Sequence, residues 1–126
     1  MEIEFILYVA DQEKSKNFYK KILETEPVLH VPGMTEFQLT VNVKLGLMPE
    51  SGIKKILLDK TPDPASGSGI PRCELYLKVP FISSYIERAM QAGAKMVSET
   101  ADRDWGDRVC YVADLDGNII ALAQTL

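Results

Sequence analysis

The feature that most constrains the fold of this 126-residue chain is one pattern that occurs in both of its halves. Residues 4–9 (EFILYV) and 74–79 (ELYLKV) lie seventy positions apart, and both begin with Glu and end with Val. A helical pattern follows each segment, and short strand-like segments follow each helix. Late in each half the offset has grown to seventy-five, where residues 44–47 (KLGL) match 119–122 (IIAL). We interpret the chain as two copies of a β-α-β-β-β module rather than two unrelated stretches.

Local residue preferences place the elements of the first module. Residues 3–9 are rich in β-branched, aromatic and aliphatic side chains, which favours a strand. Asp11 can cap a helix that follows this strand, and Pro27 cannot continue that helix. Further strands are expected at 28–31, 36–41 and 43–48.

The segment TPDPASGSG at residues 61–69 breaks every periodic pattern with proline, glycine and serine. We therefore predict one α+β domain over 1–126, with module one at 1–60, a linker at 61–71 and module two at 72–126. Gly93 is expected to end the second helix, and Gly117 to adopt a positive φ in a tight turn. The elements expected in module two are strands at 74–79, 95–98, 108–113 and 118–124 and a helix at 82–92.

Composition excludes several classes of partner. The net charge of -4 argues against nucleic acid or an anionic membrane surface. No apolar run reaches the roughly 20 residues of a membrane span, and the acidic N-terminus is unlike a secretory signal peptide. Cys73 and Cys110 form no CxxC pair or disulfide framework, although one bridge between them stays open. We expect a cytoplasmic protein with two free thiols.

Two segments carry a resemblance to a known family. LYVADQEKSKNFYKKIL at 7–23 resembles the opening strand and helix of the vicinal oxygen chelate superfamily. DWGDRVCYVADLDGNIIALAQ at 104–124 resembles the closing segment of its glyoxalase/bleomycin resistance protein/dioxygenase-like branch. The resemblance implies that the modules pair their sheets into one cupped mixed sheet. It also implies a small-molecule ligand in the cup and a homodimer.

Members of the superfamily that use a metal hold it with ligands on the first and last strand of each module. Residue by residue, the resemblance puts these positions at Glu4, Gly46, Glu74 and Ala121. Glycine and alanine have no side-chain donor, whereas a divalent cation needs several ligands around one point. The single histidine, His30, lies outside these positions and is expected to be a surface or structural residue. We therefore expect no metal and no cofactor, unless Glu4 and Glu74 suffice together with donors from a substrate.

Glu4 and Glu74 open the first strands of the two modules, and two interpretations of them stay open. If both carboxylates face the cup, their repulsion raises one pKa, which provides a general base or a partner for a cationic ligand. Alternatively, the two carboxylates form ion pairs with Lys44, Lys78 or Arg108, or lie in solvent.

Strand alternation and loop composition select the side chains that could line the cup. The candidates are Glu4, Tyr8, Glu74, Tyr76, Trp105, Arg108 and Cys110. Tyr8 and Tyr76 occupy near-equivalent positions and form either cup walls or ordinary sheet packing. Trp105 either closes over a flat ligand beside the Arg108 cation, or anchors its charged loop or a dimer contact. Cys110 is read as a small hydrophobe that could also line the cup.

The combined prediction is a small-molecule-binding protein of the glyoxalase/bleomycin-resistance type with a degenerate metal site. It would bind or sequester a small, partly aromatic ligand in the cup. The first alternative is a metal-dependent lyase, isomerase or dioxygenase of the same superfamily, which requires the last strands to be aligned differently by a residue or two. The second alternative is a metal-free enzyme that uses Glu4 or Glu74 as its base.

Overall fold

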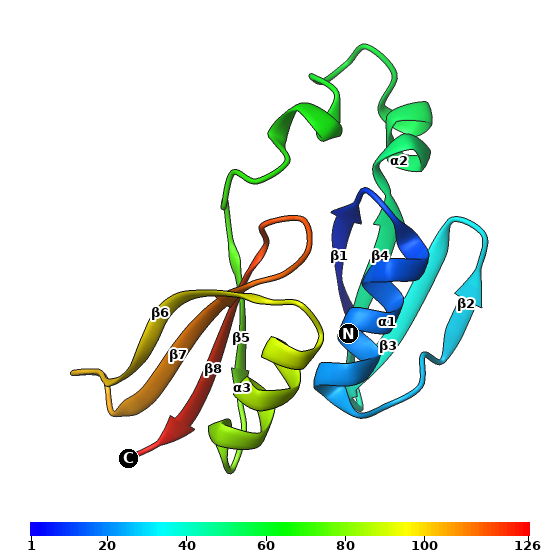
Figure 1. Cartoon of the computed structure of the whole chain (residues 1–126). Coiled ribbons are helices and arrows are strands. Elements are labelled where there is room, and N and C mark those ends of the chain that lie inside the picture. The colour runs from blue at the N-terminus through cyan, green and yellow to red at the C-terminus, as the bar shows by residue number, and fades with distance from the viewer. The chain divides into compact units, whose positions relative to one another are not determined.

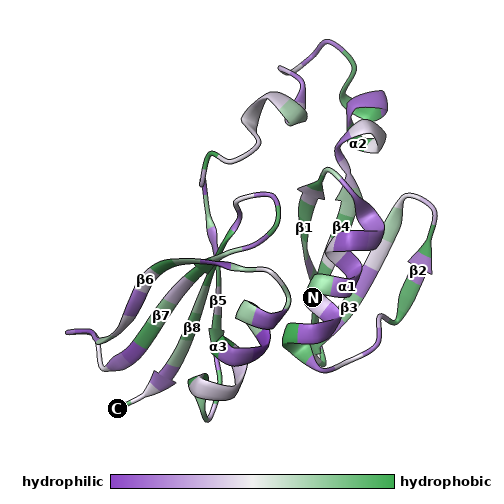
Figure 2. Ribbon diagram, in the orientation of Figure 1, coloured by the Kyte–Doolittle hydropathy of each residue, from purple (hydrophilic) through white to green (hydrophobic).

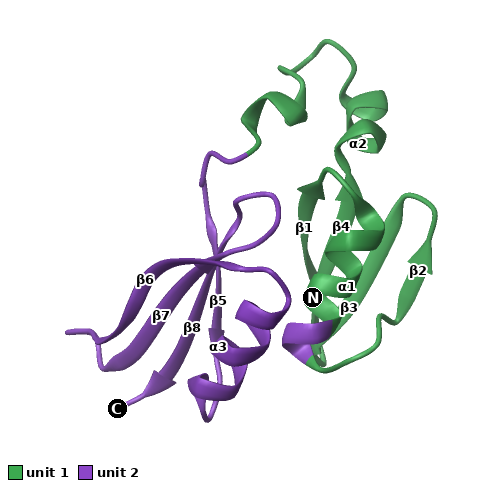
Figure 3. Cartoon of the chain, viewed as in Figure 1, with its two compact units in different colours: residues 1–20, 24–68 green, residues 21–23, 69–126 purple.

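The computed structural model describes the whole chain, residues 1–126, which divides into two compact units (Figure 1, Figure 3). Unit 1 contains residues 1–20 and 24–68, and unit 2 contains residues 21–23 and 69–126. No helix is long and apolar enough to cross a membrane. In chain order the elements are β1 (Ile3–Val9), α1 (Gln12–Leu23), β2 (Leu29–Val31), β3 (Met34–Thr40), β4 (Val43–Pro49), α2 (Glu50–Leu57), the 3₁₀ helix η1 (Pro64–Gly67), β5 (Glu74–Lys78), α3 (Ile82–Gln91), β6 (Lys95–Asp102), β7 (Asp107–Ala113) and β8 (Ile119–Thr125).

Each unit contains one four-stranded mixed sheet, and the two sheets have the same topology. The strand order is β1-β4-β3-β2 in unit 1 and β5-β8-β7-β6 in unit 2. In each sheet the first strand pairs in parallel with the last, and all other neighbours are antiparallel. The α+β class and the two tandem modules predicted from the repeat are therefore confirmed.

The strand register reproduces the offsets between the two halves. Ile6 pairs with Gly46 in unit 1, and Tyr76 pairs with Ala121 in unit 2. Strands β1 and β5 therefore differ by seventy residues, whereas β4 and β8 differ by seventy-five. Gly46 and Ala121 are counterparts, as the alignment of the two halves predicted.

Tyr8 and Tyr76 are not counterparts in this register. Tyr8 pairs with Met48, and its equivalent on β5 is Lys78. Tyr76 corresponds to Ile6 instead. The near-equivalence expected of the two tyrosines is therefore off by two residues along the strand.

Helix α1 covers one face of the unit 1 sheet. Asp11 caps this helix as predicted, because its Oδ1 accepts a hydrogen bond from the Lys14 backbone N–H at 2.9 Å. Phe18 and Tyr19 are buried on the inner side, with their ring centroids 5.1 Å apart in an edge-to-face arrangement. Thr35 of β3 is fully buried on the same side of the sheet. Its neighbours along β3 therefore project from the opposite face.

Helix α3 covers one face of the unit 2 sheet. The Ile82 backbone N–H at its start donates to Gln124 Oε1 at 2.9 Å, so this side of β8 faces the helix. Ile120 and Leu122 have the same parity along β8 and are fully buried. Figure 2 shows β7 and β8 mainly in the colours of hydrophobic residues, whereas α1 is mainly hydrophilic. Ala121 lies on the face of the sheet opposite α3.

Two predicted glycine positions have the expected backbone conformation. Gly93 follows α3 with a φ of 99°, and Gly117 adopts a φ of 86° in the turn before β8. A Cβ atom on Gly117 would lie 2.8 Å from Gly69 Cα. The Gly69 backbone N–H donates to Asp116 O at 3.1 Å, which holds the two segments together.

The segment between the modules is more regular than the sequence suggested. Helix α2 was not predicted; of its apolar residues only Ile53 is buried, and Ile56 is 67% exposed. An ion pair of 2.9 Å joins Lys54 of this helix to Asp63. Strand β6 extends to Asp102, well beyond the predicted end, because shifts in its register to β7 allow pairing to continue.

Candidate functional site

The face of the unit 1 sheet opposite α1 carries a carboxyl pair, and we call it the glutamate face, defined by Glu4, Glu36 and Gly46. Glu36 of β3 pairs with Gly46 of β4, and Ile6 pairs with Gly46 from β1. Because Gly46 has no side chain, the Glu4 carboxyl group fills the space above it. A Cβ atom on Gly46 would lie only 2.5 Å from Glu4 Oε1.

Glu4 and Glu36 share a side-chain hydrogen bond. The pKa of Glu4 is raised above its ordinary value, first by burial and then by this bond and the charge of Glu36. Lys44 Nζ lies 3.5 Å from Glu36 Oε1 and partly offsets the effect on Glu4. A hydrogen bond between two carboxyl groups requires a proton, so Glu4 is the group on this face that is best placed to hold one. The sequence analysis did not single out Glu36.

The residues at the superfamily's metal-ligand positions do not fit a divalent cation. Gly46 has no donor, and the Glu4 carboxyl already occupies its side-chain space. Ala121 has no donor either and is fully buried between its strand neighbours Tyr76 and Tyr111. The chain contains no group of three or more His, Cys, Asp or Glu side chains arranged to hold a metal ion.

The face of the unit 2 sheet opposite α3 carries an aromatic network, and we call it the tyrosine face, defined by Tyr76, Tyr111 and Ala121. Asp107 at the start of β7 is only 6% exposed. Its Oδ1 lies 2.9 Å from Lys78 Nζ, and its Oδ2 accepts a hydrogen bond from Tyr76 Oη at 2.7 Å. These two partners, Lys78 first, hold the pKa of the Asp107 carboxyl below its ordinary value. Burial and the bond to Asp107 raise the pKa of Tyr76.

Trp105 extends this network from the turn between β6 and β7. Its Nε1–H donates to Tyr76 Oη at 3.0 Å. The turn is closed by a hydrogen bond from the Gly106 N–H to the Arg103 carbonyl, with Gly106 at a φ of 95°. Trp105 remains 56% exposed and Tyr76 37% exposed, so their rings offer accessible surface while their polar atoms are bonded within the unit.

Arg103 begins the same turn and reaches back over the tyrosine face. Its guanidinium carbon lies 5.5 Å from the centroid of the Tyr111 ring, and its Nη2 donates to Ser98 Oγ at 3.2 Å. Ser98 and Tyr111 are partners in the β6–β7 register. Neither Arg103 nor Asp107 was singled out from the sequence, because both lie in a run of alternating charges that resembles a solvated loop.

Two of the predicted candidates lie away from this face. Arg108 forms an ion pair with Asp102, with contacts of 2.6 and 3.2 Å, and its strand neighbour Asp107 projects from the other side of β7. Cys110 is fully buried on the α3 side, 3.6 Å from Met96 Sδ, and burial raises the pKa of its thiol. Cys110 therefore cannot line the tyrosine face, and Arg108 is not placed beside Trp105 in the way we expected.

Tyr8 and Glu74 take no part in the two side-chain networks described above. Tyr8 is 41% exposed near the end of β1. The side chain of Glu74 is exposed at the start of β5 and forms neither an ion pair nor a hydrogen bond. The structure thus brings together Tyr76 and Trp105 from the predicted set, and joins Glu4 to an unpredicted partner.

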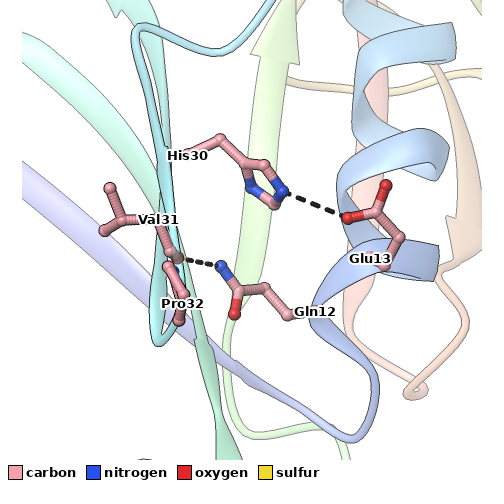
Figure 4. Close-up of a pocket in the computed structure, with 5 residues that line it drawn as sticks. All are labelled: Gln12, Glu13, His30, Val31 and Pro32. Atoms are coloured by element: carbon pink, nitrogen blue, oxygen red, sulfur yellow. Dashed lines mark hydrogen bonds and ion pairs between the residues drawn. The ribbon is translucent and has the colours of Figure 1, made fainter.

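His30 lies at a separate cavity of about 270 Å³ in unit 1 (Figure 4). Its Nε2 is 3.1 Å from Glu13 Oε2, and its Nδ1 is 2.7 Å from the buried Thr35 Oγ1. Gln12 closes the cavity by donating to the Val31 carbonyl at 2.8 Å. These bonds tie β2 and β3 to the start of α1, and both ring nitrogens of His30 are engaged within the unit.

The sheet topology and the tandem modules agree with the resemblance of the sequence to the vicinal oxygen chelate superfamily. The model of the glyoxalase-like domain family matches residues 3–126, and the chain belongs to this family.

Known relatives and solved structures agree with this membership. The uncharacterized protein Rv0887c of Mycobacterium tuberculosis is 28% identical over 121 residues, which cover 94% of this chain and 71% of that protein. A glyoxalase-related enzyme from Fulvimarina pelagi is similar in structure, with a TM-score of 0.84, 21% identity and coverage of 99% of this chain and 88% of that one. A glyoxalase/bleomycin resistance protein/dioxygenase family enzyme from Burkholderia phytofirmans has a TM-score of 0.82 at 13% identity, covering 98% and 97%. At these identities the solved structures establish the fold alone.

Proposed function

We propose that this glyoxalase-like protein binds a small, flat organic molecule on the tyrosine face without a metal ion. The observation that carries the proposal is the pairing of Trp105 with Tyr76. Both rings keep more than a third of their surface exposed, while Trp105 Nε1 and Tyr76 Oη bond to groups within unit 2. Fixed aromatic rings lose little conformational entropy on binding and favour stacked or edge-on contacts with another ring.

The absence of donor atoms at two ligand positions supports a metal-independent site. Gly46 and Ala121 offer no oxygen or nitrogen side-chain atom, and Glu4 is bonded to Glu36. A protein ligand set reduced in this way leaves a divalent cation with too few donors.

Ligand binding can be followed through Trp105, which is the single tryptophan of the chain. We expect flat aromatic compounds to change its fluorescence and to raise the unfolding temperature. At a ligand concentration a hundred times Kd, binding stabilises the folded state by about 2.7 kcal/mol.

A pair of variants tests whether the tyrosine face is the binding surface. Trp105→Leu should weaken the affinity for the same compounds by about fivefold, measured through the unfolding temperature, since a paired aromatic contact contributes about 1 kcal/mol beyond its area. Phe81→Leu is the matched control, because Phe81 is 73% exposed just before α3 and is not part of the network. Equal losses in both variants, or no stabilising compound in a broad aromatic panel, would contradict the proposal.

We also propose that the protein is a cytoplasmic homodimer. Ile3, Phe5 and Ile6 of the edge strand β1 are all more than 40% exposed, and Phe5 reaches 61%. Apolar side chains grouped on an edge strand favour association with a second chain. Light scattering after size-exclusion chromatography should give twice the mass of one chain, and a monomer at all concentrations would refute the dimer.

A further inference from the structure

The β6–β7 hairpin contains one arginine without a charged partner. Arg103 donates a single side-chain hydrogen bond, from Nη2 to Ser98 Oγ, and lies over the Tyr111 ring. Its Nε is buried and has no hydrogen-bond partner. The guanidinium group carries five N–H donors, so most of its hydrogen-bonding capacity is unused.

The second arginine of this hairpin, Arg108, does have a charged partner within the unit. Arg108 donates through Nε and Nη2 to both carboxylate oxygens of Asp102. Arg103 has no carboxylate at ion-pair distance, and a buried donor left unbonded costs about 1–3 kcal/mol. The buried Nε is closed to a group from outside, but Nη1 makes no hydrogen bond and is not among the buried unbonded atoms, so this nitrogen is open to an external acceptor.

Arg103 places its unbonded N–H donors close to the aromatic rings. Arg103 and Trp105 belong to the same turn, and Tyr111 lies beneath the guanidinium group. Lys78, which also projects from this face, already pairs with Asp107. Arg103 therefore supplies an uncompensated positive charge in the same turn as Trp105.

We propose that Arg103 recognises the carboxylate group of a flat aromatic or conjugated acid whose ring contacts Trp105 and Tyr76. A carboxylate matches the planar donor set and the single charge of one guanidinium group. Phosphate sites add further cations or a helix N-terminus, and this turn has neither. The inference rests on the proposed function, and it replaces the cationic ligand suggested by the sequence with an anionic one.

The test compares two probes of the same shape, 2-naphthoate and its neutral analogue 2-naphthamide. Their affinities are measured by isothermal titration calorimetry on the full chain, and the Arg103 Nε–H resonance is followed by NMR. We expect 2-naphthoate to bind about tenfold more tightly than 2-naphthamide, as for a hydrogen bond to a charged group. Binding of the acid should also shift the Nε–H resonance.

Two variants separate the role of Arg103 from a general effect of charge. Arg103→Gln should reduce the preference for the acid to about twofold or less. Arg108→Gln removes the same charge from the same hairpin and should leave the preference intact, because Arg108 is already paired with Asp102. The thermal unfolding of each variant verifies that it is folded.

The outcomes distinguish this inference from the proposed function. Equal binding of the two probes, or an undiminished preference in Arg103→Gln, would overturn the role of Arg103 while leaving aromatic binding in place. Failure of both probes to bind at millimolar concentration would count against the inference and the proposed function together.

Discussion

Replacing Glu4 by glutamine tests whether the glutamate face holds a shared proton. Gln has the shape of a protonated Glu, and its amide can donate permanently to Glu36. In the wild type, the corresponding hydrogen bond exists only while Glu4 is protonated, because two carboxylates repel each other. Glu4→Gln should therefore stabilise the protein at neutral pH and have little effect in acid.

The size of the effect follows from the repulsion that the substitution removes. Two unit charges about 4 Å apart in water repel by about 1 kcal/mol. Glu4 is an exposed residue, so solvent screening reduces the expected gain to about 0.5 kcal/mol.

The sign of the pH dependence is fixed by the direction of the pKa shift. The pKa of Glu4 is raised in the folded protein, so the folded state retains a proton that the unfolded chain has released. Its contribution to wild-type stability is complete below the ordinary value of 4.5 and is lost as the pH rises through the folded pKa. The advantage of Glu4→Gln over the wild type should therefore grow with pH over the same window.

Urea denaturation at a series of pH values measures this difference. With a typical m-value of about 1–3 kcal/mol/M, a gain of about 0.5 kcal/mol moves the midpoint by about 0.2–0.5 M. Glu74→Gln is the matched control, because Glu74 is the exposed counterpart of Glu4 on β5 and has no bonded partner. The reasoning is refuted if Glu4→Gln destabilises the protein at neutral pH, or if both variants show the same pH profile.

Three further outcomes follow from the structure. Tyr76→Phe should lower the free energy of unfolding by about 1 kcal/mol, because the buried Asp107 loses a donor; an unchanged urea midpoint would contradict this. Gly117→Ala should lower the free energy of unfolding by about 2–3 kcal/mol in the same assay, since a Cβ atom would meet Gly69 Cα at 2.8 Å. Gly33→Ala is the control and should lower it by only about 1 kcal/mol, because its Cβ meets no other atom. Equal losses of stability in the two variants would show that the positive φ, and not the contact with Gly69, determines the cost. Protein purified without chelator should contain less than stoichiometric metal, and EDTA should leave its unfolding temperature unchanged; a stoichiometric ion would favour the metal-dependent lyase, isomerase or dioxygenase instead.

Most of the fold could be predicted because the same order of strands and helix is encoded in both halves of the sequence. The bounds of β1 and the positive φ of Gly117 follow from local residue preferences that packing does not override. Helix α2 was missed because it is short and has Ser51 and Gly52 in its first turn, although Ile53, Ile56 and Leu57 have the spacing of a helix face. The full length of β6 was missed because irregular pairing with β7 hides its alternation.

The candidate sites were less predictable, because their partners meet only through long-range pairing. Glu36 reaches Glu4 because β4 lies between β3 and β1, and nothing local in either strand indicates this. Asp107 looked like a solvated loop residue, yet the Tyr76 hydroxyl and the Lys78 ammonium group allow it to be buried. Trp105 was among the predicted cup residues, but its hydrogen-bond partner is Tyr76, and Arg108 pairs with Asp102 instead.

The close fit of the Glu4 side chain over Gly46 limits the evolutionary routes open to this protein. A side chain introduced at position 46, including one able to chelate an ion, requires the end of the Glu4 side chain to move, because its Cβ would lie 2.5 Å from Glu4 Oε1. Donor side chains at all four ligand positions therefore require two replacements, at Gly46 and Ala121, together with a rearrangement of Glu4. No single substitution in this protein therefore restores a complete set of metal ligands at these positions.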